Sequence, residues 1–319
     1  MKLIVQIPCL NEEATLPETL RAIPRSIPGL DAVEVLVIDD GSTDATARVA
    51  REHGADHVVR FTRRKGLAAG FMAGLDASLR LGADVIVNTD ADAQYAGSEI
   101  PRLIAPILAG EADMVIGDRE VGQVEHFSWP KRRLQTLGSW VVRKVSGTNV
   151  PDATSGFRAL NREAALRINI VSEFTYTLES IIQAGKKRLA ISSVKIEARE
   201  TRPSRLFGST WEYVKRSAAT ILRIYAMYEP FKVFILLGSV LLALGLALGL
   251  RYAFFWWQGD IRGHLQSAIL SVLLLILGFQ TLLWGVMADL IASNRKLLED
   301  LLYRTRQLEL RGPQDASRD

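Results

Sequence analysis

The sequence predicts an α/β fold with a parallel sheet, followed by interfacial helices and a two-helix transmembrane hairpin. Across the first two hundred residues, short apolar runs alternate with segments of helical pattern, which is typical of βαβ units. Residues 233–250 and 265–288 carry no charge, and runs of that length can cross a bilayer. Acidic loops follow two of the expected strands. In α/β proteins, ligands bind at the sheet edge where such loops lie.

The elements of the first part follow one another in a regular order. Short buried runs predict strands, and apolar residues at helical spacing predict helices. Strands are expected at residues 2–7, 33–38, 56–61, 85–88 and 114–117. Helices are expected at residues 11–22, 43–53 and 67–81. Right-handed crossovers between parallel strands would bring the loops that follow the strands to one edge.

Two apolar runs predict the membrane hairpin. Their 18 and 24 residues span roughly 27 and 36 Å, against about 30 Å of hydrocarbon. Two buried core helices are the alternative, which the length of both runs together with their all-round apolar character disfavours. Lys and Arg number seven in residues 199–232 and six from Ser293 onward, but two in residues 251–264. The positive-inside rule therefore predicts cytoplasmic ends in a multi-pass protein of the plasma (inner) membrane.

Composition divides the chain into four expected parts. They are a cytoplasmic α/β domain at 1–198, amphipathic juxtamembrane helices at 199–230, two transmembrane helices at 231–292 and a cytoplasmic helical tail at 293–319. The second part mixes arginines with aromatic residues, which suits a membrane interface, although packing on the α/β domain is also open. Helical spacing of leucines in the tail leaves a homo-oligomer open. No signal peptide is expected, because residues 1–7 are too short for an apolar h-region.

Charge and cysteine content exclude several classes of function. The net charge is +4, and the basic residues are spread widely, so no nucleic-acid partner is expected. Cys9 is the single cysteine and there are four histidines. A disulfide framework is therefore excluded and a zinc site is disfavoured.

The two acidic loops carry the expected chemistry. Asp90 and Asp92 supply hard oxygen ligands one residue apart, and a divalent cation held there can bridge to the diphosphate of a nucleotide. An isolated pair of this kind is more often a solvated turn. The earlier loop runs Asp39-Asp40-Gly41-Ser42-Thr43-Asp44. Its acids can accept hydrogen bonds from ribose or a base, and Ser42 or Thr43 can cap the next helix.

Further motifs occur in order along the first two hundred residues. They are Pro8-Cys9-Leu10-Asn11-Glu12-Glu13, Arg64-Lys65-Gly66-Leu67-Ala68-Ala69-Gly70, Gly117-Asp118-Arg119, Trp129-Pro130-Lys131-Arg132-Arg133, Asp152-Ala153-Thr154-Ser155-Gly156-Phe157-Arg158 and Ser204-Arg205-Leu206. With the acidic loops, this set resembles glycosyltransferase family 2, which has the Rossmann-like GT-A nucleotide-sugar fold. Within that family it resembles the dolichyl- and polyprenyl-phosphate sugar synthases, the dolichol-phosphate mannosyltransferase-like subfamily. The resemblance covers residues 4–206.

The resemblance implies a role for each motif. It implies nucleotide-sugar binding by Pro8, Asn11, Glu12, Asp39, Asp40, Lys65, Gly66, Asp90 and Ala91. It implies Mg²⁺ or Mn²⁺ binding by Asp90, Asp92 and Gln94. It implies acceptor-phosphate binding by Arg119, Arg132, Ser155, Arg202 and Arg205. Of all these, the residues expected to be catalytic are Asp90, Asp92, Arg119, Arg132 and Arg205. Two positions depart from the family pattern: Asp118 stands where Ser is frequent, and Arg205 replaces the more usual Lys.

The chemistry of the acceptor favours a lipid phosphate. A sugar hydroxyl needs a general base, whereas a lipid monophosphate is already anionic and needs only orientation. Arg202 and Arg205 precede the first apolar run, although snorkelling to headgroups would also explain them. The Gln-x-x-Arg-Trp motif of processive synthases is absent, which favours a single transfer.

The expected function is inverting, metal-dependent transfer of a sugar from a GDP- or UDP-linked sugar to polyprenyl phosphate, undecaprenyl or dolichyl, at the cytoplasmic membrane face. Two alternatives stay open. One is a glycosyltransferase that acts on a hydroxyl of another lipid or glycan. The other is a non-catalytic, membrane-bound binding module.

Overall fold

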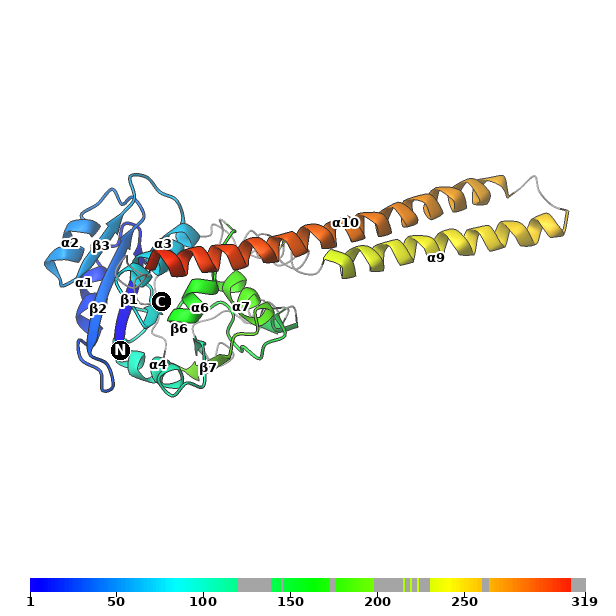
Figure 1. Cartoon of the computed structure of the whole chain (residues 1–319). Helices are drawn as coiled ribbons and strands as arrows, with labels where there is room; N and C mark the ends of the chain where they lie inside the picture. Colours follow the sequence, from blue (N-terminus) through cyan, green and yellow to red (C-terminus); the bar gives the residue numbers. More distant parts are fainter. Residues whose placement is uncertain are drawn as a thin grey trace. The chain divides into compact units, whose positions relative to one another are not determined.

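The computed structural model describes residues 1–119, 139–140, 142–144, 146–172, 176–197, 230–259 and 264–310, and the single residues 215, 219 and 223. The chain forms two compact units. One comprises Met1–Ile221 with Tyr303–Asp319, and the other comprises Leu222–Leu302. The first is an α/β unit and the second is a pair of long helices (Figure 1).

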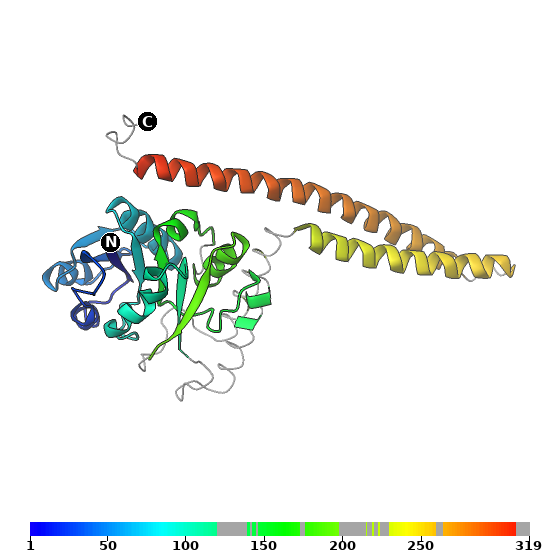
Figure 2. The ribbon, with the colours of Figure 1, turned by 60° about the horizontal axis from the view of Figure 1, so that its bottom comes forward.

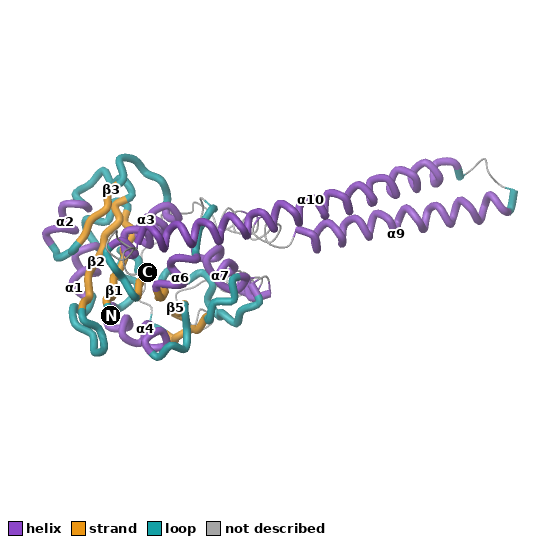
Figure 3. The backbone as a smooth tube through the Cα atoms, viewed as in Figure 1, coloured by secondary structure: helices purple, strands orange, loops and turns teal. Residues whose placement is uncertain are grey.

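A single seven-stranded sheet organises the α/β unit, in the order β3-β2-β1-β4-β6-β5-β7. Figure 3 shows strands of this sheet, in orange, between the surrounding helices. The strands are β1 (Lys2–Cys9), β2 (Ala32–Asp39), β3 (His57–Arg60), β4 (Val85–Asn88), β5 (Met114–Asp118), β6 (Arg158–Asn161) and β7 (Ile191–Lys195). Strands β1 to β4 pair in parallel, as expected. Strand β6 is antiparallel to both β4 and β5, so the first residue of β6 lies at the edge where β4 ends.

Helices connect the strands. They are α1 (Leu16–Ala22), α2 (Thr46–Glu52), α3 (Leu67–Arg80), α4 (Ile100–Leu108), α6 (Arg162–Arg167) and α7 (Tyr176–Lys186), with a 3₁₀ turn η1 at Gly97–Glu99. The expected starts of the first two helices, at residues 11 and 43, are wrong. Asn11 has a positive φ of 55°, and its N–H donates to Ser42 Oγ over 2.9 Å. The residues before α1 and α2 therefore form loops that bind each other.

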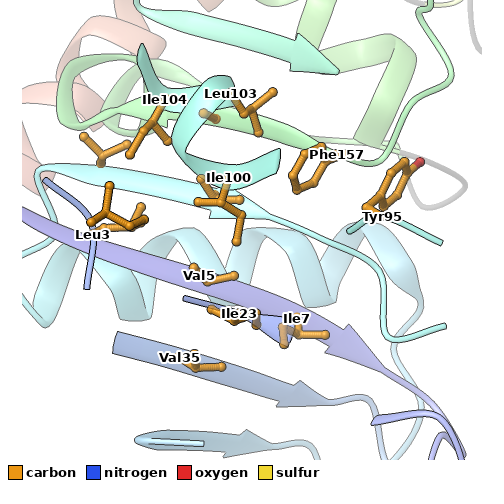
Figure 4. Packing of buried hydrophobic residues seen from close by; sticks show 14 of the residues in the cluster. Leu3, Val5, Ile7, Ile23, Val35, Tyr95, Ile100, Leu103, Ile104 and Phe157 are labelled. Atoms are coloured by element: carbon orange, nitrogen blue, oxygen red, sulfur yellow. The ribbon is translucent and has the colours of Figure 1, made fainter. Parts of the chain in front are cut away.

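Alternation along β1 divides the core between the two faces of the sheet. Leu3, Val5 and Ile7 belong to the main apolar cluster, which also includes residues of α4 such as Ile100 (Figure 4). Gln6 points to the other face, where the α-carbon of Gly74 in α3 packs against its side chain. A strand covered on both faces is apolar almost throughout, which is why residues 2–7 are recognisable as a strand in the sequence.

The second unit is a helical hairpin. Helices α9 (Pro230–Trp257) and α10 (Leu265–Leu310) run side by side (Figure 1, Figure 2), and both are long and apolar enough to cross a membrane. Only 11% and 17% of their most apolar windows is buried, whereas the core helices of a soluble protein would be mostly buried. The tail expected from residue 293 continues α10 without a break, and its residues from Tyr303 group with the α/β unit.

Small residues at heptad spacing form the contact within the hairpin. The buried residues at this spacing are Gly238 and Gly245 in α9, and Ser271, Gly278, Gly285 and Ala292 in α10. Ser271 Oγ donates a hydrogen bond to the carbonyl of Gly245 over 2.7 Å. Small side chains let two helix backbones approach closely, which is the usual packing of helices in lipid. The large apolar side chains are left on the outer surface.

Candidate functional site

The polar site lies at the sheet edge where β1, β2 and β4 end. Parallel pairing brings the loop after Asp39 beside the loop after Cys9. Antiparallel pairing sets Arg158, the first residue of β6, opposite Asn88, the last residue of β4. The segment that precedes β6 therefore lies next to the Asp90 loop, although some sixty residues separate them in sequence.

Asp39 and Asp40 are both buried and both bind the protein itself. Asp39 Oδ1 accepts the N–H of Ser42 over 2.8 Å, and its Oδ2 lies 3.1 Å from Arg60 Nε. Asp40 accepts the backbone N–H groups of Lys65 and Gly66 over 2.6 and 2.9 Å. These N–H groups precede α3, where the helix dipole favours a carboxylate. Asp40 thus holds the loop that precedes α3. The expected contact of Asp40 with a nucleotide stays a prediction.

The loop after β1 is joined to the loop after β2. Asn11 Oδ1 accepts the N–H of Thr43 over 2.9 Å, and the N–H of Glu12 donates to Thr46 Oγ1 over 2.9 Å. Asp44 Oδ1 accepts the N–H of Thr46 over 3.0 Å at the start of α2. The expected helix cap by Ser42 or Thr43 is therefore wrong, because those two residues hold Asn11 instead.

The Asp-x-Asp turn is held by hydrogen bonds. Asp92 Oδ1 accepts the N–H of Gln94 over 3.1 Å, and Ala93 between them has a positive φ of 56°. Ala91 is buried, and its carbonyl accepts the hydroxyl of Thr19 over 3.2 Å. The turn therefore presents Asp90 and Asp92 from a backbone that is held on both sides.

Asp90 is half-buried and lies among both negative and positive side chains. Burial and then the charge of Asp92 raise the pKa of Asp90 to about 7, although Arg119 and Arg158 partly oppose the shift. A carboxylate with such a raised pKa needs a further positive charge to stay ionised. Two carboxylates with the amide of Gln94 form a hard-oxygen donor set, which fits Mg²⁺ or Mn²⁺.

The described side chains would supply only part of a metal coordination shell. Among the described residues, no group of three or more His, Cys, Asp or Glu side chains is placed to hold a metal ion. Mg²⁺ is commonly held by one or two carboxylates, with water and substrate phosphates completing the shell. The Asp90–Asp92 pair fits that second pattern, in which the metal binds together with a nucleotide.

Arg119 makes a buried, bidentate ion pair. Its Nε and one Nη lie 2.7 and 3.1 Å from the two carboxylate oxygens of Asp152, and the same Nη donates to Thr154 Oγ1 over 2.7 Å. Burial by itself would lower the pKa of Arg119, but Tyr95 and Asp152 raise it above its ordinary value. Arg119 therefore stays charged and holds the loop before β6. Its expected contact with an acceptor phosphate stays a prediction.

A buried polar network behind the site was missed by sequence reasoning. Asn88 Nδ2 donates to the carbonyl of Gly156 and to the hydroxyl of Tyr176, over 2.9 and 2.8 Å. Asn88 Oδ1 accepts from Gln6 Nε2 over 2.9 Å. The available signal was a polar residue inside each of two apolar strands, because buried polar groups need partners.

Arg158, like Asn88, lies behind the site and was assigned no role from the sequence. Its side chain is fully buried, and it donates to the carbonyls of Thr177, over 3.1 Å, and Ser155. Its Nε has no hydrogen-bond partner in the described part of the chain. Burial lowers the pKa of Arg158. Arg158 joins the loop before β6 to α7 and places a positive charge in the interior behind Asp90.

The structure describes some of the remaining predicted site residues but not others. Ser155 is fully buried, and its hydroxyl donates to the carbonyl of Phe157 over 3.5 Å, so contact with an acceptor phosphate would require the loop to move. Pro8 lies near the end of β1. Arg132, Arg202 and Arg205 lie outside the described residues. Cys9, the single cysteine, is buried.

Comparisons with known proteins agree with this architecture. Residues 4–168 match the family model of glycosyl transferase family 2. The polyprenol monophosphomannose synthase of Mycolicibacterium smegmatis is 37% identical over 174 residues, which is 52% of this chain and 64% of that protein. The undecaprenyl-phosphate mannosyltransferase of Micrococcus luteus is 34% identical over 53% of this chain and 70% of that protein. The match thus spans less than two thirds of the mycobacterial relative.

The fold also matches solved structures. Glucosyl-3-phosphoglycerate synthase from Mycobacterium tuberculosis, in complex with Mn²⁺, UDP and phosphoglyceric acid, superposes with a TM-score of 0.58 at 22% identity. The superposition covers 70% of this chain and 78% of that one. At this identity the likeness establishes the fold, and the ligands of that structure remain properties of that enzyme.

Proposed function

The chain belongs to glycosyl transferase family 2 and is a glycosyltransferase with a GT-A-like sheet, and we propose that it transfers one sugar from a nucleotide diphosphate sugar to polyprenyl phosphate. The observation that carries this proposal is the hydrogen-bonded Asp90–Asp92 turn, in which burial and Asp92 raise the pKa of Asp90. Such a turn at the edge of a parallel sheet suits a nucleotide diphosphate held through a divalent cation.

The donor half of the proposal assigns the carboxylates. Asp90, Asp92 and Gln94 would hold Mg²⁺ or Mn²⁺, which supplies positive charge to the departing nucleoside diphosphate when it is bound. Asp39 and Glu12 would bind the nucleoside from the neighbouring loops. Support comes from the contacts that join these loops, because Asn11, Ser42 and Thr43 give them a defined shape before a ligand arrives.

The acceptor half rests on chemistry and on the two relatives. Both relatives are named for transfer to a polyprenyl or undecaprenyl phosphate. A phosphate oxygen of the acceptor would attack the anomeric carbon as the bond from that carbon to the nucleoside diphosphate breaks, so the configuration inverts. No proton has to be removed from the nucleophile, and no general base is needed. Arg119, Arg132, Ser155, Arg202 and Arg205 are the proposed acceptor-phosphate ligands.

The location follows from the apolar hairpin. Two helices of sufficient length with exposed apolar surfaces support a membrane-bound enzyme. The proposal places residues 1–198 as the catalytic domain on the cytoplasmic side of the plasma (inner) membrane, with residues 231–292 as the two spans. The juxtamembrane part and the tail would lie on the same side as the catalytic domain, because both are rich in Lys and Arg.

The test uses purified full-length protein in detergent. GDP- and UDP-linked sugars are supplied singly with undecaprenyl phosphate and Mn²⁺, and the products are identified by mass. One donor should yield a sugar-linked undecaprenyl phosphate. Both EDTA and Asp92→Asn should reduce the rate of its formation by orders of magnitude. Equal use of the unphosphorylated polyprenol would favour the hydroxyl-acceptor alternative. If no donor were consumed, with or without acceptor, the non-catalytic alternative would be favoured.

A further inference from the structure

The last turns of α10 lie against α6 within the α/β unit. The hydroxyl of Tyr303 lies 3.0 and 2.8 Å from the two carboxylate oxygens of Glu163. The guanidinium of Arg167 lies over the Tyr303 ring, 5.0 Å from its centroid. Gln307 Nε2 donates to the Tyr303 hydroxyl over 2.7 Å. One aromatic side chain of the tail is therefore held by hydrogen bonds and by a cation–π contact.

Arg306 makes a second attachment one turn later. Its Nη1 donates to the carbonyls of Leu166 and Ile168, over 3.2 Å in each case, and Ile168 is the C-terminal cap of α6. Carbonyls at the end of a helix lack partners within the helix and carry the negative end of its dipole. A guanidinium at this point therefore both satisfies and neutralises the end of α6.

A third attachment reaches α3. Arg80 Nη2 lies 3.1 Å from a carboxylate oxygen of Glu309. The side chains at 303, 306, 307 and 310 are half-buried, whereas those at 304, 305, 308 and 309 are exposed. Positions i, i+3, i+4 and i+7 form one face of a helix, so residues 303–310 present a defined face to the domain. The contact leaves a cavity of about 270 Å³ beside Glu163, Leu166 and Gln307.

We propose that residues 303–310 are a docking strap, and that the surface formed by α6 and the end of α3 is its binding site. The strap ties the end of the second apolar helix to the catalytic domain by side-chain contacts, in addition to the chain connection before α9. Docking also requires the tail and the α/β domain to lie on the same side of the membrane. Because the strap is part of the same chain, its effective concentration at the site is high.

The strap is expected to influence the use of a membrane-bound acceptor. Helix α6 follows β6 directly, with Asn161 as its N-terminal cap, and β6 begins two residues after Gly156. Losing the strap frees both α6 and the attachment of the domain to α10. This consequence rests on the proposed function, whereas docking itself does not.

The first experiment measures docking by hydrogen–deuterium exchange of the full-length protein in lipid nanodiscs. The strap variant is Tyr303→Phe/Arg306→Gln, and the matched control is Arg304→Gln, which removes one charge from the exposed face. Peptides covering 303–310 and 162–168 should exchange roughly 10-fold faster in the strap variant, the effect of losing about 1.4 kcal/mol of hydrogen bonding. The control should stay close to wild type.

Docking would be refuted if the strap variant and the wild type exchanged at the same rate. A second pair of variants gives an independent check from the domain side. Glu163→Ala should accelerate exchange in 303–310, and adding Tyr303→Phe to it should change little more, because both changes remove the contact between the Tyr303 hydroxyl and the Glu163 carboxylate. Simple addition of the two effects would count against the Tyr303–Glu163 contact.

The second experiment measures the influence on the reaction. In nanodiscs that contain undecaprenyl phosphate, the strap variant should show a KM for the lipid raised several-fold, while calorimetry should give an unchanged Kd for the nucleotide sugar. An unchanged KM together with faster exchange would overturn the influence on the acceptor. If wild type transferred no sugar to the lipid, the proposed function would fail, while the exchange data would still decide docking.

Discussion

The α-carbon of Gly156 faces the carboxylate of Asp90 so closely that a methyl group there would lie 2.7 Å from Oδ2. The peptide groups on both sides of this α-carbon are fixed by hydrogen bonds. The N–H of Gly156 donates to the Tyr95 hydroxyl over 3.2 Å, and its carbonyl accepts from Asn88 over 2.9 Å. The wall beside Asp90 therefore cannot easily move back, and a larger side chain would have to displace the carboxylate.

Gly156→Ala should weaken metal binding. The added methyl moves the Asp90 carboxylate, and the loss of a charge-assisted contact, worth about 1.5–3 kcal/mol, corresponds to roughly 10- to 150-fold in affinity. Calorimetry with Mn²⁺ in the presence of the nucleotide measures this affinity. Gly70→Ala is the matched control, because its methyl would meet Pro8 Cβ at an ordinary 3.7 Å. Wild-type Mn²⁺ affinity in Gly156→Ala would contradict the proposed role of Asp90.

Metal-free protein should lose stability as the pH rises from about 4 to 7. The pKa of Asp90 is raised to about 7 by burial and by Asp92, so in this range the folded state binds a proton that the unfolded state has lost. Thermal midpoints in EDTA at pH 5 and pH 8 measure the effect, with Asp90→Asn as the control that should lack this contribution. Added Mn²⁺ should stabilise wild type more at pH 8, because metal competes with the proton. Identical pH profiles for wild type and Asp90→Asn would refute the shift.

Asp152→Asn should destabilise the α/β unit strongly. It leaves the Arg119 guanidinium, whose side chain is 8% exposed, without its bidentate partner. Breaking a buried ion pair from one side typically costs about 3–5 kcal/mol. Glu52→Gln breaks the exposed pair with Arg48 and should change stability by less than about 1 kcal/mol. Chemical denaturation of both variants gives the comparison, and equal effects would show that Arg119 is not held as described.

Gly278→Val should disrupt the helical hairpin. A Cβ at this position would lie 2.8 Å from Leu242 Cγ and 3.0 Å from the backbone nitrogen of the same residue, so α9 and α10 would have to separate. Overpacking of this kind costs about 1–3 kcal/mol. Fluorescence-detected size exclusion after heating measures the loss of heat resistance, with Leu277→Val on the exposed face as the control. A variant as heat-resistant as wild type would mean that the helices do not pack through this seam.

Both ends of the chain should be cytoplasmic. A reporter fused after Asp319 should behave as cytoplasmic, and a tag inserted near Gly259, just beyond α9, should be accessible from outside. The reason is the excess of Lys and Arg on the two flanks relative to the connection between the apolar runs. Labelling of intact cells with an impermeant reagent provides the measurement. Protection of the Gly259 tag until the cells are lysed would refute the hairpin orientation.

Local pattern was sufficient for the elements that are long or strongly apolar. These elements follow from runs that are apolar throughout or whose apolar residues repeat at one spacing. They are strands β1, β2 and β4, helix α3 and both apolar helices. Strand β6 has four residues, and α6 has six, although Asn161 caps its start. Their pattern is too short to distinguish strand from helix. The antiparallel direction of β6 depends on where the chain re-enters the sheet, which local spacing does not encode.

The sequence by itself determined that acidic loops follow two strands, that the motifs resemble those of glycosyltransferase family 2 and that two apolar helices follow. These properties are local, because each depends on side chains a few residues apart. Only the tertiary structure decided that Gly156 lies against Asp90, that Asp152 takes the guanidinium of Arg119 and that the tail docks on α6. Each of these contacts joins residues about 30 to 140 positions apart. The energy of such charged groups depends on burial and on the partners that the fold brings to them, and neither can be read from spacing along the chain.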